Sequence, residues 1–142
     1  MKTIITSIVL AITLGIFPTE KTIAQTEGGT TITVTVPVSV SEGTILATLQ
    51  TEETFMQKGI QSKMGTIENG KAVMTFTGVQ PGTYAILLFH DKNNNNQMDF
   101  EINGMPKEPY GVSNNAMSYG PPAWNEAKFE VKNEPIEMEI RM

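Results

Sequence analysis

The stretch from Thr31 to Val40 alternates strictly between polar and apolar side chains, and no other feature limits the fold as much. Successive side chains of a β-strand point to opposite faces of a sheet, so a period of two predicts a strand with one face in a core. Proline cannot donate to a strand ladder, so Pro37 predicts an edge strand or a bend. A second layer must cover the apolar face, whose members are Ile32, Val34, Val36, Val38 and Val40.

Three later stretches also have strand character. Residues 44–51 and 71–77 alternate loosely, and residues 83–90 are apolar on both faces, which is typical of a central strand covered on two sides. The last of these leads into a long connection, residues 91–122, which is rich in Asn, Gly and Pro. Connections of this length inside a domain are usually functional or held by a metal.

The C-terminal part predicts two more strands. Residues 128–132 and 136–142 flank the turn Asn133-Glu134-Pro135 and predict a hairpin. Residues 52–70 fit either a short helical turn or a loose strand. Six or seven strands without a long helix predict an all-β fold, an antiparallel, Ig-like β-sandwich of about seven strands with one long loop.

Residues 1–24 have the order of a secretory signal peptide. Lys2 supplies a basic start, an apolar run reaches Phe17, and Ala24 is a small residue at the expected cut. The run is shorter than the roughly 20 residues of a membrane span. We therefore expect an exported protein, periplasmic or extracellular, with a single domain over residues 25–142 and no membrane span after cleavage.

The charge balance excludes two classes of partner. The chain has 15 acidic and 10 basic residues, a net charge of −5, and without residues 1–24 it keeps 15 − 1 = 14 acidic and 10 − 2 = 8 basic residues, a net charge of −6. Nucleic acids and anionic membranes require clustered Lys and Arg, so neither is expected as a partner. Cysteine is absent, which excludes disulfides, thiolate metal sites and a Cys nucleophile.

Oxygen-bearing side chains occupy every second position after the apolar strand, in the segment HDKNNNNQMDFE. Calcium loops of the EF-hand type place ligands at alternate positions, because a chain that curls round a cation turns every other residue inward. Glu101 stands one place before the usual bidentate Glu position, and Asn96 stands where such loops have Gly. The pattern predicts a calcium site of weak affinity, with a Kd of about 10⁻⁴ to 10⁻³ M. Its predicted ligands are Asp91, Asn93, Asn95, Gln97, Asp99 and Glu101.

A bare polar turn is the alternative for the same segment. Asn side chains bond to neighbouring backbone groups in Asx turns, so a run of Asn can fold without any cation.

A second group of residues in and around this connection is a candidate for ligand binding. Aromatic rings stack on sugar faces while amides and hydroxyls bond sugar hydroxyls, although the same rings can instead close the end of the sandwich. The single histidine either joins this surface or packs at the strand end and bonds a loop carbonyl. The candidates are His90, Tyr110, Ser113, Asn114, Tyr119 and Trp124.

Two stretches, GVQPGTYAI and FHDKNNNNQMDFEINGMPKEPYGVSNNA, resemble the bacterial domain-of-unknown-function family numbered 2141. That family has a Pro-Gly-x-Tyr-Ala strand entry, then His-Asp-x-Asn-x-Asn-Gly-x-x-Asp, then Gly-x-Pro-x-Glu-x-Tyr-Gly-x-Ser-Asn. The resemblance covers Pro81 to Ala116 and, more loosely, residues 25–142. It implies an exported protein with a prealbumin-like or carboxypeptidase-regulatory-like sandwich, and it implies no established activity. Asn96 departs from the family at the loop glycine.

These observations favour an exported, non-catalytic binding module with a calcium-stabilised loop and a glycan or an envelope protein as its ligand. One alternative is a hydrolase that uses Asp99, Glu101 or Glu108 with His90, because paired carboxylates can hydrolyse glycosides. The other alternative is a purely structural envelope protein whose loop binds nothing.

Overall fold

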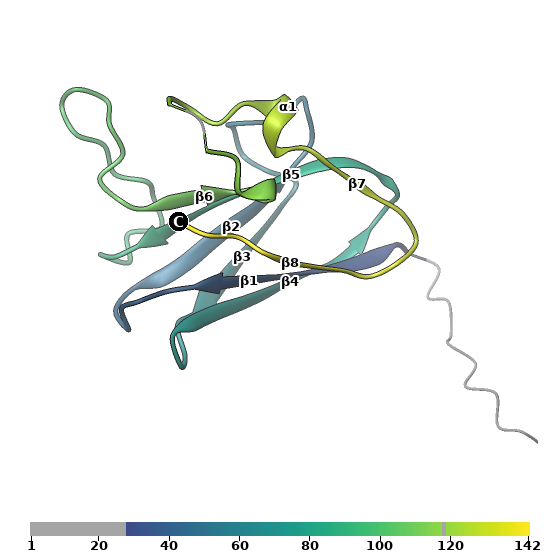
Figure 1. Ribbon diagram of the computed structural model, residues 1–142, viewed down its shortest axis with the longest axis horizontal. Helices are drawn as coiled ribbons and strands as arrows, with labels where there is room; N and C mark the ends of the chain where they lie inside the picture. Colours follow the sequence, from purple (N-terminus) through teal and green to yellow (C-terminus); the bar gives the residue numbers. More distant parts are fainter. Residues whose placement is uncertain (1–27, 118) are drawn as a thin grey trace, which may run out of the picture.

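Two β-sheets packed face to face form the molecule in this computed structural model, which describes residues 28–117 and 119–142 (Figure 1). The first sheet has the order β4-β1-β8, and the second has the order β3-β2-β5-β6, with β7 also pairing with β5. The strands are β1 Thr30–Pro37, β2 Thr44–Gln50, β3 Gln61–Thr66, β4 Lys71–Val79, β5 Gly82–Asp91, β6 Tyr110–Val112, β7 Phe129–Val131 and β8 Ile136–Glu139. The two short helices are η1 Ser113–Asn115 and α1 Trp124–Ala127.

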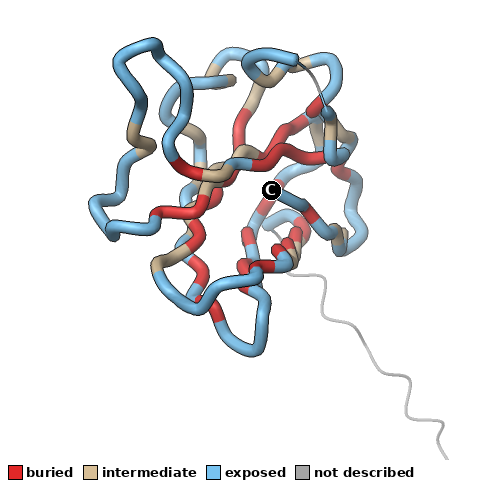
Figure 2. Tube along the Cα trace, turned by 60° about the vertical axis from the view of Figure 1, so that its left-hand side comes forward, coloured by how far each residue is buried: buried red, intermediate tan, exposed pale blue. Residues whose placement is uncertain are grey.

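The alternation at the N-terminal end becomes the centre of the core. Ile32, Val34 and Val36 of β1 are fully buried, and they lie between the two layers, where Figure 2 shows the buried positions along the facing strands. Phe76 of β4 and Leu49 of β2 are buried with them in the same cluster. Burying an aliphatic side chain of this size contributes about 1.5–3 kcal/mol, so this strip holds the layers together without disulfides.

The prediction of an all-β sandwich is confirmed. Most neighbouring strands are antiparallel, but β8 runs parallel to β1, with Ile32 opposite Ile136 and Thr35 opposite Glu139. Residues 61–66 of the undecided segment form β3, an edge strand of the second sheet.

The predicted C-terminal hairpin is wrong. β7 pairs with β5 in the second sheet, and β8 pairs with β1 in the first, so residues 132–135 cross between the layers. The turn signal in these residues is real, but a turn that joins two strands of one sheet and a turn that joins two layers have the same composition.

Pro37 does not mark an edge strand, because β1 lies between β4 and β8. It is the last residue of β1 and lies beyond the final β1–β8 pair, Thr35 with Glu139. The missing N–H therefore removes no bond from the pairing with β8.

The predicted signal peptide, residues 1–24, lies outside the described residues. None of the helices within residues 28–117 and 119–142 has the length and apolarity needed to cross a bilayer.

Candidate functional site: the Asp/Asn loop after the central strand

The Asp/Asn loop, residues 92–109, joins β5 to β6, which are neighbours in the second sheet. Its two ends are held together, because the His90 N–H donates to the Pro109 carbonyl at 2.9 Å. The loop projects from the end of the sheet at which β5 finishes (Figure 1). A rigid antiparallel pair thus supports its base.

Asp91 folds the first half of the loop back on itself. Its side chain is fully buried, and its two oxygens accept the backbone N–H groups of Asn95 at 3.1 Å and Asn96 at 2.7 Å. Asn96 has a φ of 61°, so it adopts the left-handed conformation for which calcium loops of the EF-hand type use glycine. Asn is the non-glycine residue that tolerates this conformation best, and the substitution therefore keeps the turn.

Asp99 accepts hydrogen bonds from the side chains of the alternate asparagines. Its Oδ2 accepts the Asn93 Nδ2 at 2.7 Å, and its two oxygens accept the Asn95 Nδ2 at 3.2 and 3.1 Å. The other end of each amide accepts a backbone N–H two residues on, Asn93 from Asn95 at 3.1 Å and Asn95 from Gln97 at 2.9 Å. The structure therefore brings four of the six predicted ligands into one hydrogen-bonded cluster.

The other two predicted ligands are placed differently. The side chain of Gln97 is exposed, although its backbone N–H belongs to the cluster. Glu101 is exposed and lies in the tip of the loop, where its N–H donates to the Met105 carbonyl at 2.8 Å and its carbonyl accepts the Gly104 N–H at 2.9 Å.

Glu108 holds two parts of the loop together by hydrogen bonds. The pattern of alternate oxygen-bearing residues did not predict this role. It is 5% exposed, and its oxygens accept the backbone N–H groups of Lys92 at 2.9 Å and Asp99 at 3.3 Å. One carboxylate thus joins both flanks of the cluster. The residue lies beyond the twelve-residue pattern, and its neighbours Lys107 and Pro109 give no sign of burial.

A calcium ion fits the chemistry of this cluster. Ca²⁺ takes about six to eight hard oxygen ligands, and the cluster holds two carboxylates and two side-chain amides. Half a turn of an Asn amide exchanges its nitrogen for its oxygen, so Asn93 and Asn95 can offer oxygen beside Asp99 if they give up the bonds that their oxygens accept from the Asn95 and Gln97 N–H groups. Among the described residues no three His, Cys, Asp or Glu side chains form a metal-binding group, so amide and carbonyl oxygens must supply most ligands.

The connection between β1 and β2, together with the first residue of β2, contacts the base of the loop. The His90 Nε2–H donates to the Glu42 carbonyl at 2.7 Å, and the Thr44 hydroxyl donates to the Asn94 Oδ1 at 3.2 Å. Gly43 has a φ of 80°, and a Cβ at this position would lie 2.5 Å from the Asp91 carbonyl oxygen. Gly43 is therefore required both by its conformation and by its contact with the base of the loop.

Ser113 and Asn114, both ligand candidates, bond to backbone groups of neighbouring elements. The buried Ser113 hydroxyl accepts the Ile86 N–H at 3.0 Å and donates to the Ala127 carbonyl. Asn114 donates from Nδ2 to the carbonyls of Glu126 at 3.0 Å and Lys128 at 2.9 Å.

Asn115 continues this pattern on the other sheet. Its Nδ2 donates to the Glu139 carbonyl at 3.0 Å, and its Oδ1 accepts the Arg141 N–H at 2.7 Å. Ser113, Asn114 and Asn115 thus tie η1 to α1, to the start of β7 and to the end of β8, and we call them the SNN clamp.

The aromatic candidates and His90 fall in separate environments. His90 is 2% exposed, whereas Tyr119 is fully exposed and Tyr110 is 39% exposed. Trp124 begins α1 and packs edge to face on Phe55, with the ring centroids 5.5 Å apart.

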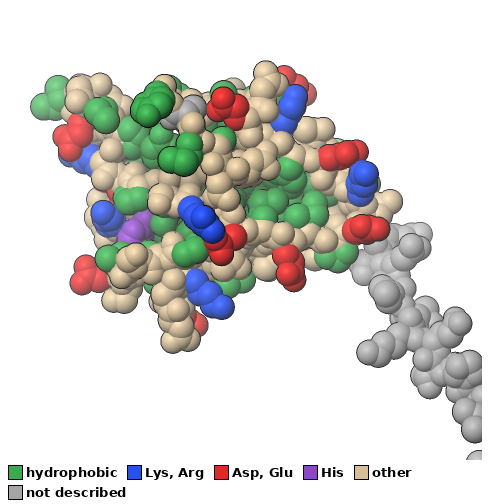
Figure 3. All heavy atoms as spheres, viewed as in Figure 1, with side chains coloured by type: hydrophobic (Ala, Val, Ile, Leu, Met, Phe, Trp, Pro, Cys, Tyr) green, Lys and Arg blue, Asp and Glu red, His purple; other side chains and the backbone are tan. Residues whose placement is uncertain are grey.

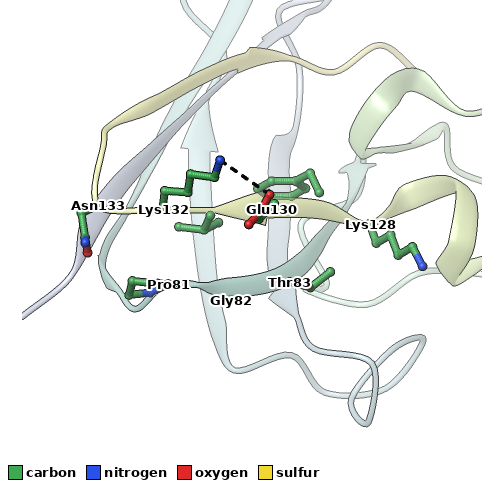
Figure 4. A pocket seen from close by; sticks show the side chains of 9 residues that line it. Pro81, Gly82, Thr83, Lys128, Glu130, Lys132 and Asn133 are labelled. Carbon is green, nitrogen blue, oxygen red and sulfur yellow. Dashed lines mark ion pairs between the residues drawn. The ribbon is translucent and has the colours of Figure 1, made fainter.

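A shallow cavity of about 800 Å³ lies at the other end of β5 from the loop (Figure 4). Lys132 and Glu130 form an exposed ion pair at 3.9 Å along its rim. The cavity contains none of the predicted site residues, and it is lined by Pro81, Gly82, Thr83, Lys128, Phe129, Glu130, Val131, Lys132 and Asn133.

Comparison with known proteins gives one finding. Neither the curated proteins nor the solved structures contain a match to the chain. A family model described as "Uncharacterized protein conserved in bacteria (DUF2141)" matches residues 32–139, which run from β1 to β8 and include the whole loop. The chain therefore belongs to the DUF2141 family of bacterial proteins.

Proposed function

We propose that the protein is an exported, non-catalytic binding module whose Asp/Asn loop is stabilised by Ca²⁺ and presents a surface to a glycan or protein ligand. The observation that carries this proposal is the convergence of Asp91, Asn93, Asn95 and Asp99 in one cluster. The signal-like order of residues 1–24 supports export.

Calcium is favoured over other cations by the type of donor. The cluster offers only oxygen and amide groups, and the chain has no Cys and a single His, so soft metals lack their usual ligands. Mg²⁺ demands near-ideal octahedral geometry, whereas Ca²⁺ accepts the irregular set that a loop provides. With two carboxylates in the cluster, the expected Kd is about 10⁻⁴ to 10⁻³ M.

A binding role is favoured over catalysis by the state of the candidate catalytic groups. Both oxygens of Glu108 accept backbone N–H groups, and the His90 ring donates to a carbonyl. These bonds hold both groups in structural positions. An exposed side-chain amide outside the cluster, such as that of Asn96, suits hydrogen bonding to glycan hydroxyls or to peptide groups.

Calcium titration of the protein that begins at Gln25 tests the proposal, and both sheets lie within that segment. A ligand that binds only the native state stabilises it by RT ln(1 + [L]/Kd), about 1.4 kcal/mol at roughly 10 mM Ca²⁺ for a Kd of about 1 mM. We expect a melting temperature several degrees higher and a matching calorimetric isotherm.

The matched variants are Asp99→Asn in the cluster and Glu130→Gln on β7, each of which removes one exposed or half-exposed negative charge. Asp99→Asn should abolish the calcium shift, and Glu130→Gln should keep it. An unshifted wild-type melting curve at about 10 mM Ca²⁺, which is ten times the expected upper Kd, would rule out the site.

A further inference from the structure

Large apolar side chains stand exposed on two loops at one end of the molecule. Ile102, at the tip of the Asp/Asn loop, is 108% exposed, and Met117 and Tyr119, after the SNN clamp, are 99% and 112% exposed. Both segments lie at the upper end in Figures 1 and 2, and Figure 3 shows hydrophobic side chains projecting along that edge. We call this set the apolar crest, and it consists of Phe100, Ile102, Met105, Met117 and Tyr119.

The tip that carries Ile102 is a built hairpin. Phe100 and Pro106 form an antiparallel bridge, and the Lys107 N–H donates to the Asp99 carbonyl at 2.8 Å. The Met105 N–H donates to the Asn103 side chain at 3.1 Å, and Gly104 takes a φ of 83°. The tip is thus ordered before any partner arrives, so docking loses little conformational entropy.

The absence of charge on the crest indicates which kind of surface it can bind. Residues 102–106 and 116–124 contain no charged side chain, and the nearest charges at the hairpin base are Asp99, Glu101 and Lys107. Exposed apolar patches of this kind mark interaction sites with proteins or membranes. The net negative charge of the chain disfavours an anionic surface, whereas an uncharged crest with an aromatic ring suits the interface of a neutral bilayer.

We propose that the apolar crest docks the protein onto zwitterionic phospholipid surfaces, with Ile102 and Met105 entering the boundary between headgroups and acyl chains. A fluid interface accepts two convex tips without a matching cavity. Self-association through the crest is the competing outcome, and a stable dimer would have to bury roughly 800 Å² per subunit. This docking goes beyond the proposed calcium site and does not require it.

Vesicle flotation of the protein that begins at Gln25 tests the proposal. We expect binding to phosphatidylcholine vesicles in the absence of calcium, and weaker binding when phosphatidylglycerol is mixed in. The double variant Ile102→Ser/Met105→Ser should lower the partition coefficient at least about tenfold, because each side chain loses its transfer free energy. The matched control is Met64→Ser, which changes a side chain that is 58% exposed on β3, the opposite edge strand of the sheet, and it should bind as the wild type does.

Several outcomes would overturn the docking proposal. They are a wild type that stays unbound to phosphatidylcholine, equal losses in the crest and Met64 variants, and binding seen only with anionic lipid and calcium. Sedimentation separates the remaining possibility, since a wild-type dimer that the crest variant converts to a monomer would assign the crest to self-association. Calcium calorimetry on the crest variant should match the wild type, so failure of docking and failure of the calcium site are distinguishable.

Discussion

Two carboxylates with different surroundings show what single residues contribute to the loop. Glu108 is buried and bonds two backbone N–H groups, whereas Glu101 is exposed at the tip. Glu108→Gln replaces one acceptor oxygen by an NH₂ group that faces a backbone N–H. Leaving such a buried group unsatisfied costs about 1–3 kcal/mol, so we expect a loss of this size in the free energy of unfolding. Urea denaturation measures it, Glu101→Gln is the control, and equal effects of the two variants would contradict the assigned role.

Two glycines with similar backbone angles allow the cost of a left-handed conformation to be distinguished from the cost of a steric clash. Gly43 and Gly104 have φ values of 80° and 83°, but a Cβ meets the Asp91 carbonyl only at Gly43, while nothing lies within 4 Å at Gly104. Alanine at Gly104 should cost only the left-handed conformation, about 1–2 kcal/mol. Alanine at Gly43 should cost about 1–3 kcal/mol more, because the loop base must shift. Thermal denaturation of both variants measures the two losses of stability. Equal losses would contradict the claim that the contact with the Asp91 carbonyl requires glycine at position 43.

At the level of residues, the sequence predicted those members of the site that are grouped by their spacing along the chain. The side chains of Asp91, Asn93, Asn95 and Asp99 do belong to one cluster, since a tightly curled chain turns alternate side chains the same way. Asn93 and Asn95 reach Asp99 through their amide nitrogens, and Asp91 accepts backbone N–H groups of the same turn. Glu108 could not be predicted, because its role depends on the return path of the loop. That path brings together groups which are up to sixteen residues apart in the chain.

Among the elements, β8 has an open edge whose C-terminal end is bonded by a side chain instead of a strand. Asn115 uses its amide to bond the Glu139 carbonyl and the Arg141 N–H, as a neighbouring strand would. We expect Asn115→Gly, which keeps the left-handed backbone at φ 52°, to raise the exchange rate of the Arg141 amide and to cost about 1–2 kcal/mol.

Hydrogen exchange followed by NMR tests this expectation. Asn103→Gly is the control, because it removes an asparagine bond at the exposed loop tip. If Arg141 exchanges at the wild-type rate in Asn115→Gly, the clamp does not protect the edge of β8.

Most of the predicted strands are present in the structure, but the predicted pairing of the two C-terminal strands is wrong. Periodicity identified β1, β2, β4 and β5, because it reports burial of one face or of two. It contains no information on which strands pair, so the parallel β1–β8 pair and the separation of β7 from β8 were missed. The three-residue strand β6 was also missed, since Tyr110–Val112 is too short to show a period.

Across the whole molecule, the position of the loop determines how far a bound ion can act. The loop is anchored on β5, which pairs with β2, β6 and β7 and therefore holds the second sheet together. If calcium binds as proposed, it should stabilise the complete sandwich. The single tryptophan, Trp124, reports on this, because it lies in α1, packs on Phe55 and takes no part in the Asp/Asn cluster.

Urea unfolding should therefore show one transition by Trp124 fluorescence and by far-UV circular dichroism, and calcium should raise both midpoints equally. The slope with urea should stay unchanged, because the surface exposed on unfolding is the same. In Asp99→Asn neither midpoint should move. A midpoint of Trp124 that calcium leaves in place, together with slower exchange of the loop amides, would mean that the loop orders locally and that its ion contributes nothing to the stability of the two sheets.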